Sequence, residues 1–272
     1  MIKKRLIFTL LYSDNFFFQS RNFNIQKVGD ISWLEKNYNF KNISYYIDEL
    51  IILDISRNEK NKENFIKNIN KISEFCFVPI TVGGGIKSLE DAKFFLKNGS
   101  DKILINSSIF ENFKIINQIT EIYGEQSVVL GIDLKKIDND YFAYSNNGQK
   151  KINENPKKII QNLQKSNFGE LLLNSINQDG TGMGIDYSTL DLLPTKFNKP
   201  LILSGGTGNF KHILEGLEKK FVSAISTSNL LNFVGDGLIK TRNKLLSEKI
   251  DFPNWDIELL QNLKSIFNDQ SK

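Results

Sequence analysis

The chain of 272 residues has very little of the residue types that build disulfide frameworks and metal clusters, with one cysteine and one histidine. A single cysteine cannot form a disulfide bond within the chain, and these two residues are too few for a cluster of zinc type. Cys76 stands in an apolar run just before an expected strand, so we expect a small core residue there. We expect neither a metal ion nor another cofactor.

The chain also lacks a strong charge of one sign and any long apolar run. Lysine and arginine number 35 against 31 acidic residues, which gives a net charge of +4. No basic stripe interleaved with aromatic residues is present, so we expect no nucleic-acid partner. The apolar stretch at residues 6–11 is far too short to span a membrane, and no cleavage pattern follows it. We therefore expect no membrane span and a cytoplasmic location.

What the sequence does contain is a regular alternation of short apolar runs with longer amphipathic segments. The runs lie at 5–11, 49–55, 79–83, 102–106, 127–133, 170–175, 200–204 and 222–227. The helix-like segments between them include 60–75, 88–98, 111–123, 156–166, 186–193 and 209–219. Continuous apolar runs are typical of strands buried on both faces, so the pattern predicts successive βαβ units with a parallel sheet.

One motif occurs twice in this alternation. Pro79 to Gly85 reads PITVGGG and Pro200 to Gly206 reads PLILSGG, 121 residues further along the chain. Glu49 with Glu170 and Ser107 with Ser228 keep the same offset. Eight strands with a repeat at half their length predict two (βα)4 halves closed into a (βα)8 TIM barrel. A doubly wound sheet is the alternative, but it does not need eight strands or such a repeat.

We predict a barrel over residues 1–248 and a helical extension over 249–272, with its helix near 254–267. Residues 134–151 read as a hairpin inserted after the fifth strand, and Asn147-Gly148 is a turn signal within it. The first strand is followed by a segment, 13–20, that we expect to be a mobile loop.

The two glycine motifs predict two phosphate-binding cradles at the carboxyl ends of strands. Glycine lets a phosphate approach backbone N–H groups, and the following helix N-terminus favours negative charge. The residues expected to bind phosphate are Gly84, Gly85, Asn106, Ser107, Asp179, Gly180, Gly205, Gly206, Thr227 and Ser228. Two cradles indicate an elongated ligand with a phosphate at each end. Tight turns that only pack strand against helix are the alternative.

These motifs make the chain similar to a known family over nearly its whole length, to about residue 245. It resembles the cyclase subunit of imidazole glycerol phosphate synthase, from histidine biosynthesis. The resemblance rests on Lys4-Arg5, Asn22-Phe23, Asp48-Glu49-Leu50, Leu53-Asp54-Ile55, Thr81 to Ile86, Asp101-Lys102, Ile105-Asn106-Ser107, Ile132-Asp133, Gly169-Glu170, Asp179-Gly180-Thr181 and Ser204-Gly205-Gly206.

The resemblance implies a glutaminase partner whose ammonia passes along the barrel axis to the opposite mouth. The ammonia entrance would be the ring of Arg5, Glu49, Lys102 and Glu170, and the glutaminase would dock near Asp101 and Gln126. Without the resemblance, charge at the amino end of a barrel indicates a stabilising feature. At the mouth, the family uses two aspartates for acid/base catalysis on a bisphosphate substrate. Asp133 stands at the second of these positions.

The mouth departs from the family pattern. Leu11 replaces the first catalytic aspartate, and Gln19 stands where a functional lysine is expected. Because loss of a general acid or base typically costs about 10²–10⁴-fold in rate, the leading interpretation is a barrel that conducts ammonia without making imidazole glycerol phosphate. A divergent branch of the family fits this description. The resemblance to that branch implies conversion of an acetamido to an acetamidino sugar in surface-polysaccharide synthesis, with an ATP-dependent sugar amidotransferase.

Two other interpretations stay open. The chain could be a true cyclase whose first acid has moved to Asp14, three positions beyond Leu11. It could also be a scaffold without catalytic activity that binds a phosphate-bearing small molecule and stabilises its glutaminase. Charge reversal at Lys102 separates conduction from scaffolding.

Overall fold

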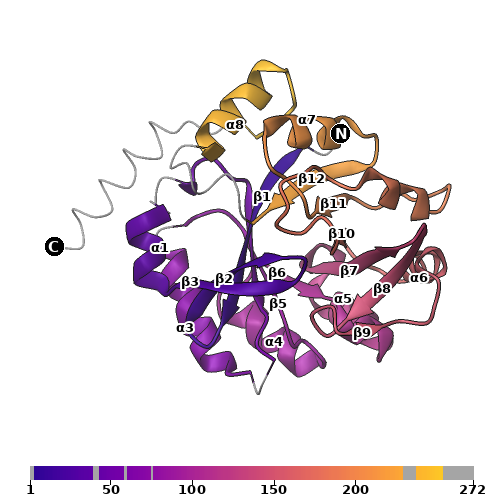
Figure 1. The fold of residues 1–272 in the computed structure, drawn as a ribbon. Coiled ribbons are helices and arrows are strands. Elements are labelled where there is room, and N and C mark those ends of the chain that lie inside the picture. Colours follow the sequence, from indigo (N-terminus) through magenta and orange to yellow (C-terminus); the bar gives the residue numbers. More distant parts are fainter. Residues whose placement is uncertain (1–2, 39–42, 58–59, 75, 229–236, 254–272) are drawn as a thin grey trace.

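The computed structural model describes residues 3–38, 43–57, 60–74, 76–228 and 237–253. Eight parallel strands form a closed barrel with helices around it (Figure 1), as the sequence predicts. The barrel strands are β1 (Arg5–Ser13), β4 (Glu49–Asp54), β5 (Ile80–Gly83), β6 (Lys102–Ile105), β7 (Val128–Ile137), β10 (Glu170–Ser175), β11 (Leu201–Ser204) and β12 (Val222–Thr227). They follow the order β10-β11-β12-β1-β4-β5-β6-β7, and pairing of β10 with β7 closes the ring.

The connecting segments are mostly α-helices. They are α1 (Ile31–Tyr38), α3 (Lys62–Ser73), α4 (Leu89–Lys97), α5 (Lys114–Tyr123), α6 (Pro156–Leu163), α7 (Phe210–Glu218) and α8 (Gly237–Ser247). Short 3₁₀ helices occur at η1 (Ser107–Phe110), η2 (Glu125–Ser127) and η3 (Tyr187–Leu192). The helix-like segment predicted at 186–193 is therefore a 3₁₀ helix rather than an α-helix. Pro194 disfavours helical geometry at Leu193, which is extended with ψ 139°, so the segment cannot continue as an α-helix.

Alternate residues of the strands fill the barrel interior in layers. The charged side chains of Arg5, Glu49, Lys102 and Glu170 lie at the amino end of the strands. Above them is an apolar layer made of Ile7, Ile51, Leu104, Val129, Leu172, Ile202 and Ala224. A larger apolar core lies between the sheet and the surrounding helices. The interior therefore changes from charged to apolar to polar along the axis.

The segment after β1, expected to be a loop, is a hairpin. β1 continues beyond the barrel and pairs antiparallel with β2 (Phe16–Arg21), which pairs with β3 (Asn24–Gly29). The aromatic run favours a strand, because alternate side chains can pack on one face. Phe17 is 2 % exposed and its ring lies 5.7 Å from that of Tyr12. The prediction of a loop at 13–20 was wrong for this reason.

The second half of the barrel carries a hairpin in the equivalent place. β7 continues beyond the barrel and pairs with β8 (Asp140–Ser145), which pairs with β9 (Lys150–Lys151). The turn at Asn147-Gly148 joins β8 to β9, whereas β7 and β8 are joined at 138–139. A Cβ added at Gly148 would lie 2.6 Å from the ring of Phe23, at the β2–β3 turn. The two hairpins therefore meet.

The last described helix, α8, is held against the barrel by an ion pair. Arg242 in α8 donates to both carboxylate oxygens of Asp48, at 2.9 and 2.8 Å, and so fixes the last helix to the amino end of β4. The predicted helix near 254–267 lies outside the described residues, so the boundary at 248 stays a prediction. Within the described part of the chain, no helix is both long and apolar enough to cross a membrane.

Candidate functional site

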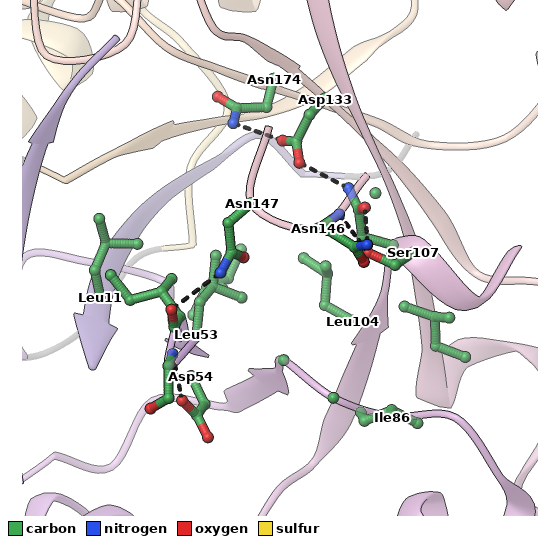
Figure 2. Close-up of a pocket in the computed structure, with 18 of the residues that line it drawn as sticks. Leu11, Leu53, Asp54, Ile86, Leu104, Ser107, Asp133, Asn146, Asn147 and Asn174 are labelled. Carbon is green, nitrogen blue, oxygen red and sulfur yellow. Dashed lines mark hydrogen bonds between the residues drawn. The ribbon is translucent and has the colours of Figure 1, made fainter. Parts of the chain in front are cut away.

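A cavity of about 650 Å³ opens at the carboxyl ends of the barrel strands (Figure 2). Residues from both halves of the chain line it, including Leu11, Asp133 and Ser204. It reaches down to Ile51 and Leu104 of the apolar layer. Its size is that of a small-molecule site, and this end of a (βα)8 barrel is where active sites are found.

Asp133 is the carboxylate of this cavity that two amides hold in place. Asn106 from the end of β6 and Asn174 from β10 each donate a side-chain N–H to one of its oxygens, at 2.9 Å (Figure 2). Burial raises the pKa of Asp133 to about 6, because the two donated hydrogen bonds only partly offset the loss of hydration. A carboxyl group with a pKa near neutrality can both give and take a proton at physiological pH.

Across the barrel from Asp133, the wall is apolar. β1 is four strands away from β7 in the ring of eight, so Leu11 and Asp133 end opposite strands. Leu11 and the neighbouring Leu53 both line the cavity (Figure 2). Asp14, the candidate for a relocated acid, is exposed in the β1–β2 turn and is not among the cavity-lining residues. Nothing in its position supports a role in proton transfer.

The first predicted cradle faces the cavity. Gly84 and Gly85 both line it, with φ values of 102° and 83°, a region that favours glycine. A Cβ at Gly84 would lie 2.1 Å from the carbonyl oxygen of Asp54, so no larger residue fits. Two other predicted phosphate ligands are engaged within the protein: Asn106 holds Asp133, and the Ser107 hydroxyl accepts from the Asn146 N–H at 2.9 Å.

The second predicted cradle is organised differently. Ser228 lines the cavity, whereas Thr227, Gly180, Gly205 and Gly206 are not among the lining residues. Gly206 is covered by the preceding loop, because the Gly184 N–H donates to its carbonyl oxygen at 2.8 Å. Binding of phosphate by these residues stays a prediction.

Asp179 and Gly180 have a role that sequence reasoning missed. The Asp179 carboxylate accepts from the Ser20 hydroxyl at 2.9 Å and from the Phe23 N–H at 3.0 Å. A Cβ at Gly180 would lie 1.9 Å from the Ser20 carbonyl oxygen. These two residues therefore anchor the β2–β3 hairpin over the mouth. The one sequence signal for this anchoring role is the carboxylate of Asp179, which can accept a hydrogen bond from a backbone N–H in a turn.

At the other end of the barrel, the four predicted ring residues do come together. Arg5 donates to Glu49 at 2.8 Å, and Lys102 donates to Glu49 at 2.9 Å and to Glu170 at 2.7 Å. Arg5 also binds Glu170, which closes the ring. Burial alone would raise the pKa of Glu170, but the hydrogen bond and charge of Arg5, together with Lys102, hold that pKa below its usual value.

Only one apolar layer separates this ring from the cavity. Ile51, Leu104 and Leu172 line the cavity floor. Each follows a ring residue by two positions on the same strand, namely Glu49, Lys102 and Glu170, so each lies directly above it. The ring and the cavity thus lie on either side of a single apolar layer.

The amino-end surface around the ring carries the two residues predicted to dock a glutaminase. Asp101 and Gln126 are both exposed in the described structure. Large apolar side chains are also exposed close before the amino ends of barrel strands: Phe77 is 47 %, Ile122 54 % and Phe221 42 % exposed. Exposed apolar residues among polar ones are typical of a protein–protein interface. Docking at this face stays a prediction.

The fold and the cavity define a (βα)8-barrel protein with a small-molecule site at the carboxyl ends of its strands. Comparison with known proteins narrows this class, since the family model described as "Histidine biosynthesis protein" matches residues 21–234. The chain belongs to this family.

Similar proteins cover almost the whole chain. The "Putative imidazole glycerol phosphate synthase subunit hisF2" of Parasynechococcus marenigrum (strain WH8102) is 44% identical over 244 residues, which are 90% of this chain and 91% of the relative. The "Imidazole glycerol phosphate synthase subunit HisF" of Prosthecochloris aestuarii is 33% identical over 86% of this chain and 92% of the relative. The subunit of the same name from Exiguobacterium sibiricum is 34% identical over 75% of this chain and 81% of the relative.

Proposed function

We propose that this protein is the synthase subunit of a glutamine-dependent pair. It receives ammonia from a glutaminase at the amino end of the barrel and passes it to the cavity at the carboxyl end. The observation that carries the proposal is the ring of Arg5, Glu49, Lys102 and Glu170, which lies one apolar layer below the cavity floor. The names of the relatives, which are subunits of imidazole glycerol phosphate synthase, support the same pairing.

A ring of this composition is suited to a neutral cargo. Its two cations and two anions are bound to one another, so the charges are satisfied without water. Ammonia is small, uncharged and able to both donate and accept hydrogen bonds. It can pass an apolar layer that excludes ions, because burying an unpaired charge costs far more than burying a small polar molecule.

The mouth supports a slow cyclase step. Ring closure requires proton transfer on both sides of the reacting atoms, and paired carboxylates divide these roles. Here Asp133 has the hydrogen bonds and the raised pKa of one such group, while Leu11 on the opposite strand can transfer no proton. We infer that ring closure by this chain is about 10²-fold or more slower than by a version with both acids, so imidazole formation is not its main reaction.

The test uses the purified barrel and its glutaminase, supplied with glutamine and the ribonucleotide bisphosphate that the family cyclises. We expect glutamine hydrolysis in the complex but little imidazole product, and a large gain of product for Leu11→Asp. Asp14→Ala serves as the matched control, because Asp14 is exposed and lies outside the cavity lining. Rapid cyclisation by the parent chain that Leu11→Asp does not improve would contradict the proposal.

Full imidazole glycerol phosphate synthesis is the second candidate. The pKa of Asp133, about 6, favours it, because one residue can then act in turn as base and acid. The same assay separates the two candidates. A scaffold without transfer activity would instead leave glutamine-dependent product unchanged when Lys102 is replaced by Glu.

For the acceptor of ammonia, we propose an acetamido sugar from surface-polysaccharide synthesis, converted with an ATP-dependent sugar amidotransferase. Its support is the resemblance to a divergent branch of the family and the apolar residue Leu11 at the mouth. Reconstitution of the barrel, the glutaminase and such an enzyme, with ¹⁵N-amide glutamine, tests it. Label in an acetamidino product is expected, and label that stays in free ammonium would contradict it.

A further inference from the structure

Side-chain amides gather in the wall of the cavity. Among the described residues that line it, five carry such a group. They are Asn106 after β6, Asn174 in β10, and Asn146, Asn147 and Gln149 in the turn between β8 and β9. An amide offers both donors and an acceptor and carries no charge. This part of the wall therefore suits a ligand whose groups donate and accept hydrogen bonds without being ionised.

The β8–β9 turn is fixed at the mouth while most of its amides stay available. Asn147 donates a side-chain N–H to the Ile55 carbonyl oxygen at 3.0 Å (Figure 2). The backbone N–H of Asn146 donates to the Ser107 hydroxyl at 2.9 Å. The side chains of Asn146 and Gln149 are exposed and make no hydrogen bond within the described part of the chain. They can bind a ligand without breaking a contact of the fold.

The other two amides border the carboxylate at the end of β7. Asn106 and Asn174 each use one N–H to hold Asp133, at 2.9 Å. A side-chain amide has a second N–H, and in both residues this group has no acceptor among the described residues. A ligand between the β8–β9 turn and Asp133 thus has uncharged donors and acceptors on two sides.

The wall across the barrel from this carboxylate offers an apolar surface. Leu11 and Leu53 are neighbours in the register of β1 with β4, and Phe23 from the β2–β3 turn also lines the cavity. Phe23 has a φ of 63°, which is costly for a bulky side chain, and Asp179 supports it by accepting its N–H at 3.0 Å. Strained backbone held in place in this way is typical of functional sites. A ligand here needs an apolar face as well as polar groups.

We propose that the cavity binds a sugar ring, whose hydroxyl groups bond to the amides of the β8–β9 turn and whose C–H face packs on the apolar wall. Hydroxyl groups donate and accept without charge, so amides match them without a counter-ion. The inference rests on the proposed function for the role of the cavity as the acceptor site, and it assigns residues to the uncharged part of the acceptor. It holds whether or not the same ligand also carries phosphate groups.

Ligand-observed NMR on the full chain, without glutaminase or glutamine, tests this site independently of ammonia transfer. The probes are N-acetyl-D-glucosamine, for a sugar of polysaccharide synthesis, and D-ribose, for the sugar of a ribonucleotide. We expect saturable binding of at least one of them, and the tighter of the two identifies the source of the sugar. Saturable binding of neither probe would overturn the proposal. A complex that binds a probe but transfers no ammonia would contradict the proposed function alone.

Variants of the turn locate the binding. Asn146→Gly/Gln149→Ala should weaken binding of the tighter probe by about tenfold, because two uncharged hydrogen bonds are lost. Glycine suits the φ of 52° at Asn146, so the turn should keep its shape. Asn139→Gly/Asn153→Ala removes two exposed amides on either side of the same hairpin, outside the cavity lining, and should leave affinity unchanged.

Two results with these variants would also overturn the proposal. One is parent affinity in Asn146→Gly/Gln149→Ala, and the other is an equal loss of affinity in both double variants. Thermal unfolding of each variant checks that lost binding is not lost folding.

Discussion

The two ends of the barrel place carboxylates in opposite surroundings. At the amino end, Glu170 is bound by Arg5 and Lys102, which hold its pKa below the usual value. At the carboxyl end, Asp133 has only neutral amide donors, and burial raises its pKa to about 6. The same functional group is therefore fixed in its charged form at one end and able to exchange a proton at the other. Cations decide the difference, since both groups are extensively buried.

The largest effect should come from removing the carboxyl group that can exchange its proton. Asp133→Asn is expected to lower product formation by about 10²–10⁴-fold, because an amide neither gives nor takes a proton at neutral pH. The Leu11→Asp background gives the most measurable product. Turnover should fall equally with glutamine and with added ammonium salt, because Asp133 lies above the ring. A loss confined to glutamine would show that Asp133 acts on ammonia passage instead.

The pH dependence of stability should have opposite signs at the two ends. Burial raises the pKa of Asp133 to about 6 in the folded state, whereas the unfolded chain releases this proton near the ordinary pKa of 3.8. Its contribution to the free energy of unfolding therefore falls by up to about 3 kcal/mol as pH rises from 4 to 6, and is level above. Glu170, with a lowered pKa, contributes stability above its ordinary pKa and loses it as pH falls.

Urea unfolding between pH 4 and 8 measures the contribution of Asp133. The parent chain should lose stability relative to Asp133→Asn as pH rises to 6, which isolates the contribution of Asp133 from those of all other groups. The free energies of unfolding of the two chains should also differ by an amount that does not vary with pH, because the substitution alters the hydrogen bonds with Asn106 and Asn174. A difference that does not vary with pH would contradict the raised pKa.

Breaking the ring should have a smaller effect on stability. Lys102→Met leaves Glu49 and Glu170 with Arg5 as their shared cation, so we expect the free energy of unfolding to fall by about 1–3 kcal/mol. Lys97→Met on the exposed end of α4 is the matched control and should change it by less than about 0.5 kcal/mol. Glutamine-dependent product should fall more than ammonium-dependent product. Equal falls would argue against passage of ammonia at the ring.

The smallest effect should be local to the mouth. Asp179→Ala removes the acceptor for Ser20 and Phe23, at a cost of about 1–2 kcal/mol, mostly in the β2–β3 hairpin. Amide hydrogen exchange should accelerate over residues 16–29, while amides of α5 serve as the internal control. Exchange that accelerates equally in both segments would show that Asp179 stabilises the whole fold rather than this hairpin.

Much of the fold could be predicted because buried strands require runs of apolar residues, which can be recognised in the sequence. All eight barrel strands were predicted, since strands covered on both faces must be continuously apolar. At the start of α4, Ser88 followed by Leu89-Glu90-Asp91 is a sequence pattern typical of a helix N-cap, and Ser88 forms a capping box with Asp91. The β2–β3 hairpin was missed because it lies outside the alternation of barrel strands and helices. An aromatic run alone does not show which strand it would pair with.

The site was predictable where the resemblance to the family supplied the grouping. It grouped Arg5, Glu49, Lys102 and Glu170, and each of these stands at the amino end of a barrel strand. The positive charge beside the first cradle could not be predicted from the sequence. Arg57, Lys60 and Lys62 have the pattern of a solvent-exposed start of an ordinary helix. Only the folded chain places them beside Gly84. The holding of Asp133 by Asn174 likewise depends on the register of β7 with β10.

The contact between Gly148 and Phe23 joins the two halves of the barrel over the mouth. Each half extends its first strand, β1 or β7, into a hairpin. One half alone could carry a strand, a cradle and a hairpin, but no partner for the hairpin tip. The cover over the mouth therefore needs both halves, and a side chain at position 148 would have to displace the Phe23 ring.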